Sequence, residues 1–259
     1  MMPNIHGYPL VAMFSVGLVL ILGAGEFGRW LGQRSGRRGA PGVSTLEGAI
    51  LGLLALMIGF TFSMALSRFE TRQDGVVVEA AAIGTTALRA RLLPAPHNHE
   101  AVKLLQDYVQ LRLDLTRRPL SPQEFDDVIA RSNAIQEALW QQAKAVAAKD
   151  NAMVPTGLFV QSLNEMIDDQ EKRLAAFNNR LPVIVLIALY GVSTIGIGFA
   201  GYGSGIESKR TRVPVYLIGI LVAAMVLLIQ DIDRPGAGFI TVSQQPMANA
   251  AAALAAFRD

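Results

Sequence analysis

Hydrophobic residues gather along the chain in four long stretches that contain no Asp, Glu, Lys or Arg. Each stretch is close to the roughly 20 residues that a helix needs to cross the hydrocarbon core of a membrane. Charged residues border every stretch, as is usual where a helix leaves the lipid. The pattern predicts four transmembrane helices, over residues 8–30, 46–68, 181–205 and 213–232. We expect the first to be a retained helix, since a signal peptide begins with positive charge and this one does not.

Between the second and third stretches, apolar residues recur instead at steps of three and four, which is typical of amphipathic helices. This spacing predicts that the second span continues as one long helix as far as Pro94. A further helix is expected from Glu100 to Thr116. Residues 69–180 are thus predicted to form an extramembrane helical bundle.

The third helix of this bundle has a sequence signature at its start. Ser121, Pro122 and Glu124 provide an N-cap, a proline in the first turn and the carboxylate of a capping box. This helix should reach Lys149, and a fourth should run from Thr156 until Pro182 kinks it at the third span. Residues 233–259 are predicted to be a C-terminal segment, whose Ala-rich end favours a helix too weakly apolar to cross a membrane.

The predicted fold is therefore an all-α integral membrane protein, with four transmembrane helices and a helical bundle inserted between the second and the third. Composition agrees, because 51% of the residues are hydrophobic and 17% are charged, with a mean hydropathy of +0.35. The net charge of +2 comes from arginines beside the spans, so nucleic acid is not an expected partner. The expected partner is the lipid bilayer. The absence of cysteine excludes disulfides and thiolate metal sites.

Basic residues also predict the orientation. Both short loops between spans are rich in Lys and Arg, whereas the residues before the first span have none; the loop residues are Arg29, Arg34, Arg37 and Arg38, then Lys209, Arg210 and Arg212. The positive-inside rule places such loops in the cytoplasm. The bundle and both termini are accordingly expected on the extracytoplasmic side.

Two motifs that suggest cofactor chemistry have simpler explanations. Gly196, Gly198 and Gly201 form a GxGxxG string, but no strand precedes it, and glycines within a span favour close helix packing. His97, His99 and Glu100 offer ligands for a divalent metal, although neighbouring histidines in a loop are more often simply solvated. No catalytic constellation is present, so we expect neither an enzyme, a cofactor nor a metal.

The second span carries a stripe of small residues at steps of three and four: Gly48, Gly52, Ala55, Gly59, Ser63 and Ser67. Such a stripe permits close packing between helices. It also suits a pore wall, in which Ser63, Ser67 and Thr61 would offer hydroxyls and Ile58, Phe60 or Phe62 would form an apolar constriction. The pore-lining candidates are Ile58, Phe60, Phe62, Ser63 and Ser67.

A charged cluster is predicted at one membrane face, because four spans bring the end of the second, the start of the third and the end of the fourth to the same side. Its members are Arg68, Arg72, Arg180, Asp231, Asp233 and Arg234. Charges at this depth require partners. The cluster is interpreted either as an ion-pair lock between helices or as a charged pore mouth that selects ions. Pro235, Gly236 and Gly238 predict a tight turn directly after it.

Three segments carry a family resemblance. The string from Asp231 to Met247, with its DxDRP and VSQQP motifs, is similar to the end of the last span in the bacterial bestrophin-like domain family. Phe62–Arg72 with Glu79–Arg89, and Leu163–Asp168, resemble the family's junctions after the second and before the third span. The resemblance implies a location in the bacterial cytoplasmic membrane and an architecture like that of bestrophins. These are pentameric, calcium-activated chloride channels whose large helical portion is cytosolic. No acidic cluster matches their calcium site, and the charge rule predicts the opposite orientation.

The predicted function is a homo-oligomeric ion channel, a pentamer by resemblance, which passes small inorganic ions, anions foremost, and whose second span lines the pore. The alternative is a non-conducting membrane-anchored sensor or scaffold, whose bundle binds a ligand or a partner protein.

Overall fold

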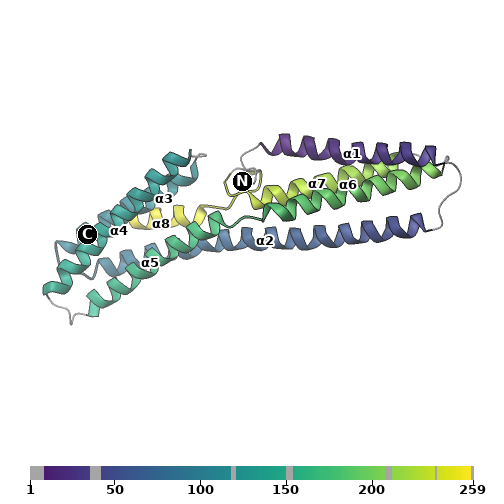
Figure 1. The fold of residues 1–259 in the computed structure, drawn as a ribbon. Coiled ribbons are helices and arrows are strands. Elements are labelled where there is room, and N and C mark those ends of the chain that lie inside the picture. The colour runs from purple at the N-terminus through teal and green to yellow at the C-terminus, as the bar shows by residue number, and fades with distance from the viewer. Residues whose placement is uncertain are drawn as a thin grey trace. The chain divides into compact units, whose positions relative to one another are not determined.

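The computed structural model describes residues 9–35, 42–117, 121–149, 154–207, 212–236 and 238–257, and every regular element in these ranges is a helix (Figure 1). Tyr8, where the first span was predicted to begin, and the loop residues Arg37, Arg38, Lys209 and Arg210 lie outside the described residues. The helices are α1 (Leu10–Arg34), α2 (Val43–Ala90), α3 (His97–Arg117), α4 (Pro122–Lys149), α5 (Val154–Asn178), α6 (Val183–Ile206), α7 (Val213–Asp233) and α8 (Gln245–Ala255). The all-α fold class is confirmed.

The chain forms two compact units. The span unit comprises Met1–Phe69 and Arg180–Ile240, and the bundle unit comprises Glu70–Asn179 and Thr241–Asp259. The long helix α2 contributes its first part to the span unit and its second part to the bundle unit. The predicted continuation of the second span as one helix is thereby confirmed.

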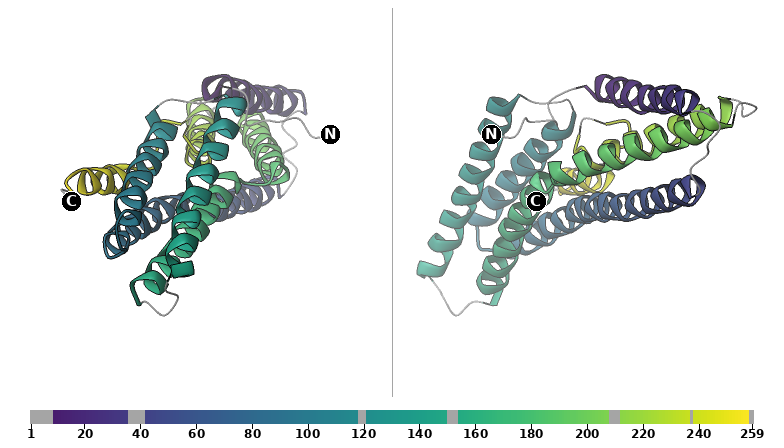
Figure 2. Two further views of the ribbon diagram at one scale, coloured as in Figure 1. Left: turned by 90° about the vertical axis from the view of Figure 1, so that its left-hand side faces the viewer. Right: turned by 45° about the vertical axis from the view of Figure 1, so that its right-hand side comes forward.

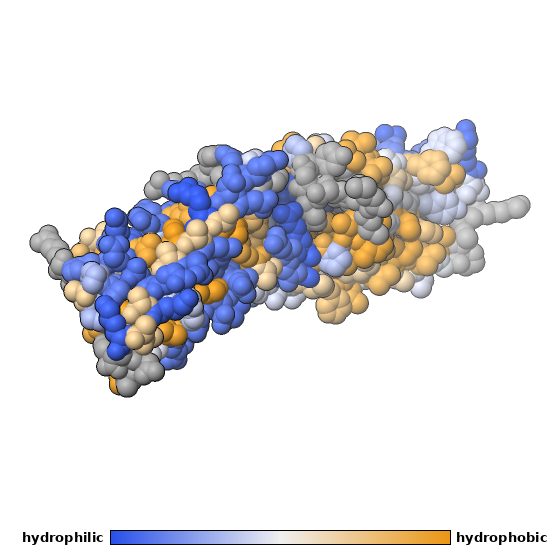
Figure 3. Space-filling view, turned by 60° about the vertical axis from the view of Figure 1, so that its left-hand side comes forward, coloured by the Kyte–Doolittle hydropathy of each residue, from blue (hydrophilic) through white to orange (hydrophobic). Residues whose placement is uncertain are grey.

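The span unit contains α1, the first part of α2, α6 and α7, and each of these helices is long and apolar enough to cross a membrane. Figure 3 shows hydrophobic surface over this part of the molecule in orange. The exposed apolar side chains include Val19, Phe60 and Leu217. Hydrocarbon solvates such a surface, and the helices satisfy their own backbone hydrogen bonds. The protein is a multi-pass membrane protein.

Within the span unit, α1 and α6 lie side by side at very short range (Figure 2). A Cβ atom at Gly28 would overlap the carbonyl oxygen of Gly198, and one at Gly201 would overlap that of Gly25. The GxGxxG string therefore serves close helix packing, as predicted. Gly196, its first member, instead faces Ile50 of α2, whose Cγ2 would lie 3.3 Å from a Cβ at this position.

The bundle unit has its own hydrophobic core, contributed by the second part of α2 and by α3, α4, α5 and α8. Its fully buried side chains include Ile83, Leu105, Tyr108, Leu139, Phe159, Leu163, Met166 and Met247. The C-terminal segment reaches this core through α8, where Met247, Ala251 and Leu254 form one buried face. The side chain of Gln106 in α3 donates a hydrogen bond of 2.9 Å to the carbonyl of Leu254.

The start of α4 has the predicted capping box. The backbone N–H of Ser121 donates to Glu124 Oε2 at 2.8 Å, and the N–H of Glu124 donates to Ser121 Oγ at 3.2 Å. These reciprocal bonds satisfy two N–H groups that a helix start otherwise leaves open.

The predicted kink at Pro182 is instead a break. Helix α5 ends at Asn178, residues 179–182 are not helical, and Pro182 is the N-cap of α6. Proline disfavours helical backbone in the residue before it and has no N–H of its own. The chain therefore leaves one helix and begins another here.

Candidate functional site

The small residues of α2 lie on an exposed face of the helix. Gly48, Gly52, Ala55, Gly59, Ser63 and Ser67 are all exposed. Apart from the adjoining residues and backbone of α2 itself, no described atom lies within 4 Å of the place that a Cβ would take at Gly48, Gly52 or Gly59. These glycines therefore do not serve close packing against any described helix of the same chain, in contrast to those between α1 and α6.

The opposite face of α2 packs inside the span unit. Leu54, Thr61 and Ala65 are buried there, and the hydroxyl of Thr61 donates a 2.7 Å hydrogen bond to the carbonyl of Met57. Thr61 was predicted to offer its hydroxyl to a pore, but the helix turns this side chain inward and its own backbone uses the hydroxyl. Polarity alone cannot distinguish these two faces, because both are largely uncharged.

The five predicted pore-lining residues divide between the two sides of α2. Phe60, Ser63 and Ser67 are exposed. Ile58 and Phe62 are half-buried and pack against the core of the span unit. All five lie on the part of α2 that belongs to the span unit.

At the end of α7, the carboxylate of Asp231 binds the chain that follows the helix. Its oxygens accept the backbone N–H groups of Phe239 at 2.7 Å and Ile240 at 3.0 Å. Gly236 adopts a φ of +73°, which glycine reaches without strain, and a Cβ at Gly238 would collide with the Asp231 carboxylate. The tight turn predicted after Pro235 is therefore present, and Asp231 is its centre.

Asp233 fixes a second junction. Both of its carboxylate oxygens lie 3.0 Å from the backbone N–H of Leu181, which the break between α5 and α6 leaves without a helical acceptor. The guanidinium of Arg234 approaches the Met13 sulfur at 2.8 Å. The two aspartates of the DxDRP motif thus hold the ends of α6 and α7 through backbone groups.

The charged residues predicted to meet at one membrane face belong to different units. Arg68, Arg180, Asp231, Asp233 and Arg234 are part of the span unit, whereas Arg72 belongs to the bundle unit. Arg72, Asp231, Asp233 and Arg234 are buried.

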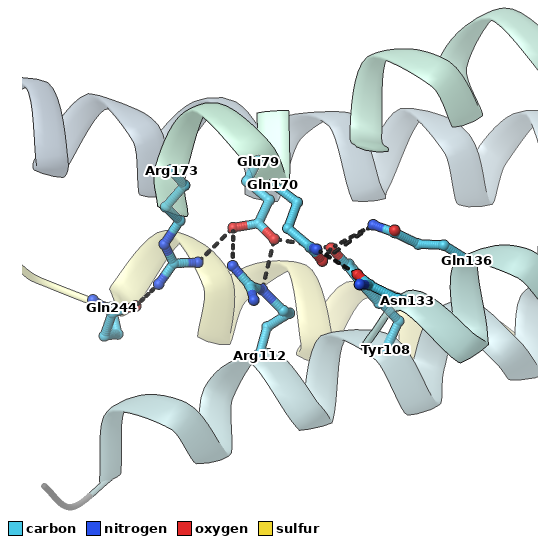
Figure 4. A network of polar contacts seen from close by, with 8 residues as sticks. All are labelled: Glu79, Tyr108, Arg112, Asn133, Gln136, Gln170, Arg173 and Gln244. Carbon is cyan, nitrogen blue, oxygen red and sulfur yellow. Dashed lines mark hydrogen bonds and ion pairs between the residues drawn. The ribbon is translucent and has the colours of Figure 1, made fainter. Parts of the chain in front are cut away.

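A network of polar side chains that was not predicted lies at the centre of the bundle unit (Figure 4). Glu79 of α2 is fully buried, and its carboxylate is bound by two guanidinium groups. Arg112 of α3 places Nε 2.7 Å from Oε1 and Nη2 3.2 Å from Oε2, and Arg173 of α5 places Nη1 2.6 Å from Oε2. One carboxylate thus joins three helices.

The network continues into α4 through neutral groups. The hydroxyl of Tyr108 lies 3.1 Å from Glu79 Oε1 and 2.6 Å from Gln170 Oε1, so these acceptors share one proton. Gln136 donates to Gln170 Oε1 at 3.1 Å, and Gln170 donates to Asn133 at 3.2 Å. At the other end, Arg173 donates to Gln244 Oε1 at 3.0 Å.

Charge and burial fix the protonation of this network. Burial alone raises the pKa of the Glu79 carboxyl, but the charges and hydrogen bonds of Arg112 and Arg173 outweigh it and hold that pKa below its ordinary value. Burial and the Glu79 charge both raise the pKa of the Tyr108 hydroxyl. At neutral pH the carboxylate is therefore charged and the phenol neutral, and two arginines face one acid.

The sequence did carry a signal for Glu79. This residue lies three positions after Val76 and four before Ile83, on the apolar face of α2. A carboxylate on such a face requires a buried cation. Its partners come from α3 and α5, and spacing along α2 says nothing of them.

The predicted histidine group is engaged differently. His97 Nδ1 lies 2.7 Å from Gln142 Oε1, and its Nε2 lies 3.3 Å from the ammonium of Lys149. Both ring nitrogens of His97 are therefore engaged by side chains of α4. Among the described residues, no three His, Asp or Glu side chains are grouped to hold a metal ion.

Comparison with known proteins agrees with this architecture. A family model described as a bestrophin-like domain matches residues 13–247. The chain is similar to a solved bacterial bestrophin homolog from Klebsiella pneumoniae, with 15% identity and a TM-score of 0.63 over 94% of this chain and 95% of that one. A point variant of that homolog gives 17% identity and a TM-score of 0.68, over 95% and 97%. A structure described as a membrane protein gives 16% and 0.64, over 96% and 100%. No curated protein sequence matches the chain.

Proposed function

The chain belongs to the bestrophin-like domain family, and from this premise we propose that it is a homo-oligomeric membrane channel for small inorganic anions, with α2 lining the pore. No catalytic role is proposed. The resemblance to bestrophins makes a pentamer the expected assembly.

The uncovered face of α2 is the observation that carries the proposal. Glycines whose Cβ positions meet no described neighbour, together with exposed Ser63 and Ser67, give a narrow uncharged wall that the described residues of the protomer do not cover. Several copies around an axis would bring these walls together and enclose a path. Phe60 at this face, with Ile58 and Phe62 at its edge, would supply an apolar constriction that gates by dewetting.

The charges near the end of the spans favour anions over cations. Within the span unit, Arg68, Arg180 and Arg234 outnumber Asp231 and Asp233 at this end of the helices. A pore mouth with this excess of positive charge would raise the local concentration of anions. In the intact oligomer these residues are the proposed selectivity region.

We predict that Ser63→Phe lowers the unitary conductance of purified protein in planar bilayers severalfold. In a pentamer, the five added phenyl rings would narrow the central pore. Ser15→Phe is the matched control, since Ser15 is an exposed serine on α1 outside the proposed wall. In a chloride gradient, the current through the wild-type protein should reverse its sign near the chloride equilibrium potential. Equal currents from both variants, or a silent wild type with a broad panel of ions, would rule out a pore along α2.

We propose that the protein is oriented in the membrane with its bundle on the extracytoplasmic side. The chain lacks cysteine, so a single introduced cysteine is the only thiol that can react with a label. We predict that His99→Cys, at an exposed position in α3, reacts with a membrane-impermeant maleimide in intact cells. Ser35→Cys, in the loop after α1, should react only after permeabilisation. The reverse pattern would place the bundle in the cytoplasm.

A further inference from the structure

A pocket of about 320 Å³ opens between α4 and α5 within the bundle unit. Asn133, Gln136, Glu137 and Trp140 line it from α4, and Asn164 and Ile167 line it from α5. The α4 residues follow the spacing of a single helix face, and the two α5 residues lie three apart, so two neighbouring faces form its walls. Its volume is at the lower end of the range usual for small-molecule sites, which is about 300–1,000 Å³.

The lining has the chemistry of a cation site. Trp140 is half-buried against the bundle core and contributes an indole, and Ile167 adds an apolar side chain. Glu137 is the one charged residue among the lining side chains, and it is negative. Asn133, Gln136 and Asn164 are amides that donate and accept hydrogen bonds. An indole beside a carboxylate attracts an organic cation, because the ring face and the acid are both negative.

We propose that this pocket binds a small organic cation, of the quaternary ammonium or alkylammonium class, with its charged end between Trp140 and Glu137. A hydroxyl or amide on the ligand would meet the asparagines. This binding function does not depend on conduction through α2, so either can fail without the other.

The pocket also contacts the buried network. Gln136 is 7% exposed, lines the pocket, and donates hydrogen bonds to Gln170 at 3.1 Å and to the Tyr108 hydroxyl at 3.4 Å (Figure 4). Asn133 accepts from Gln170 at 3.2 Å. A ligand that engages these two amides would therefore compete with the hydrogen bonds that join α4 to the carboxylate of Glu79.

Trp140 makes the proposal directly testable, since the chain has only two tryptophans. In a Trp30→Phe variant of the full chain in nanodiscs, choline chloride should change the fluorescence of Trp140 saturably, at ionic strength held constant with NaCl. The neutral isostere 3,3-dimethyl-1-butanol should not. Glu137→Gln, at an exposed position of α4, should weaken choline binding at least tenfold. Glu171→Gln, an exposed acid of α5 outside the pocket, should leave it unchanged.

Three outcomes would overturn the proposal. The first is no saturable response to choline in a variant whose far-UV circular dichroism matches the wild type. The second is equal affinity for the alcohol, which would make the pocket merely apolar. The third is an equal loss of affinity in Glu137→Gln and Glu171→Gln, which would reflect general surface charge and no specific site.

Discussion

Glu79→Gln is expected to lower the free energy of unfolding by about 3–5 kcal/mol, the usual cost of removing one partner from a buried ion pair. The substitution keeps the size of the side chain but leaves the guanidinium groups of Arg112 and Arg173 facing a neutral amide. Arg112 is 1% exposed, so water cannot solvate its charge in place of the lost carboxylate. The measurement is equilibrium unfolding in detergent, followed by circular dichroism.

The control for this experiment is Glu171→Gln, which makes the same chemical change at an exposed position of α5. It should shift stability by no more than about 0.5 kcal/mol. A second variant, Glu79→Leu combined with Arg112→Met, removes the carboxylate and its most deeply buried partner and should recover part of the loss, because only Arg173, which is 12% exposed, then lacks its carboxylate. If Glu79→Gln unfolded like the control, the carboxylate would not be what holds these three helices together.

The same network predicts a pH dependence. The pKa of Glu79 is lower in the folded protein than in the unfolded chain, so its stabilisation is fully present above the unfolded pKa of about 4.3. It is lost as the pH falls through the lower folded value. The difference in stability between wild type and Glu79→Gln should therefore be constant at neutral pH and shrink below about pH 4. If the stability difference between wild type and Glu79→Gln grew on acidification, Glu79 would not be held in its charged form by the fold.

Gly28→Ala and Gly201→Ala are expected to destabilise the span unit by about 1–3 kcal/mol each, the range found for overpacking. The added methyl groups would overlap the carbonyl oxygens of Gly198 and Gly25, which are backbone atoms and cannot rotate away. Relief requires α1 and α6 to separate, which loses the close contact along both helices. Thermal unfolding monitored by size-exclusion chromatography in detergent measures the effect.

Two other glycines on the same helices provide matched controls, for which the expected change in stability is zero or favourable. Gly23 of α1 and Gly191 of α6 have no described atom within 4 Å of a Cβ. Alanine there adds no clash and gains helix propensity, which is worth up to about 1 kcal/mol. Gly23→Ala and Gly191→Ala should therefore be neutral or stabilising. If all four variants behaved alike, the glycines would act through propensity and not through the contact between α1 and α6.

Some details of the structure follow from local sequence. The capping box at Ser121 and Glu124 and the turn at Gly236 depend on residues within a few positions of each other, and both are present as predicted. The break before Pro182 differs from the predicted kink, although proline explains both. What the local sequence does not show is the acceptor for the freed N–H of Leu181, which is Asp233, far along the chain.

The candidate site shows the same division. Spacing identified the small stripe of α2, but a stripe at steps of three and four suits both a helix contact and a wall facing outward. The contact is made elsewhere, by Gly25, Gly28, Gly198 and Gly201, and no described part of the protomer covers the glycines of the stripe on α2. The buried carboxylate of Glu79 was visible in the helical pattern, whereas its partners were not.

The sequence by itself determined which segments are apolar and how the α4 start and the turn at Gly236 are formed, because hydrophobic transfer and backbone capping act on residues near one another in the chain. Only the tertiary structure decided which glycines meet, which face of α2 remains open and which arginines neutralise Glu79. Those features depend on the rotation of each helix about its axis and on the choice of its neighbours. Both are set by packing between residues that the sequence places far apart.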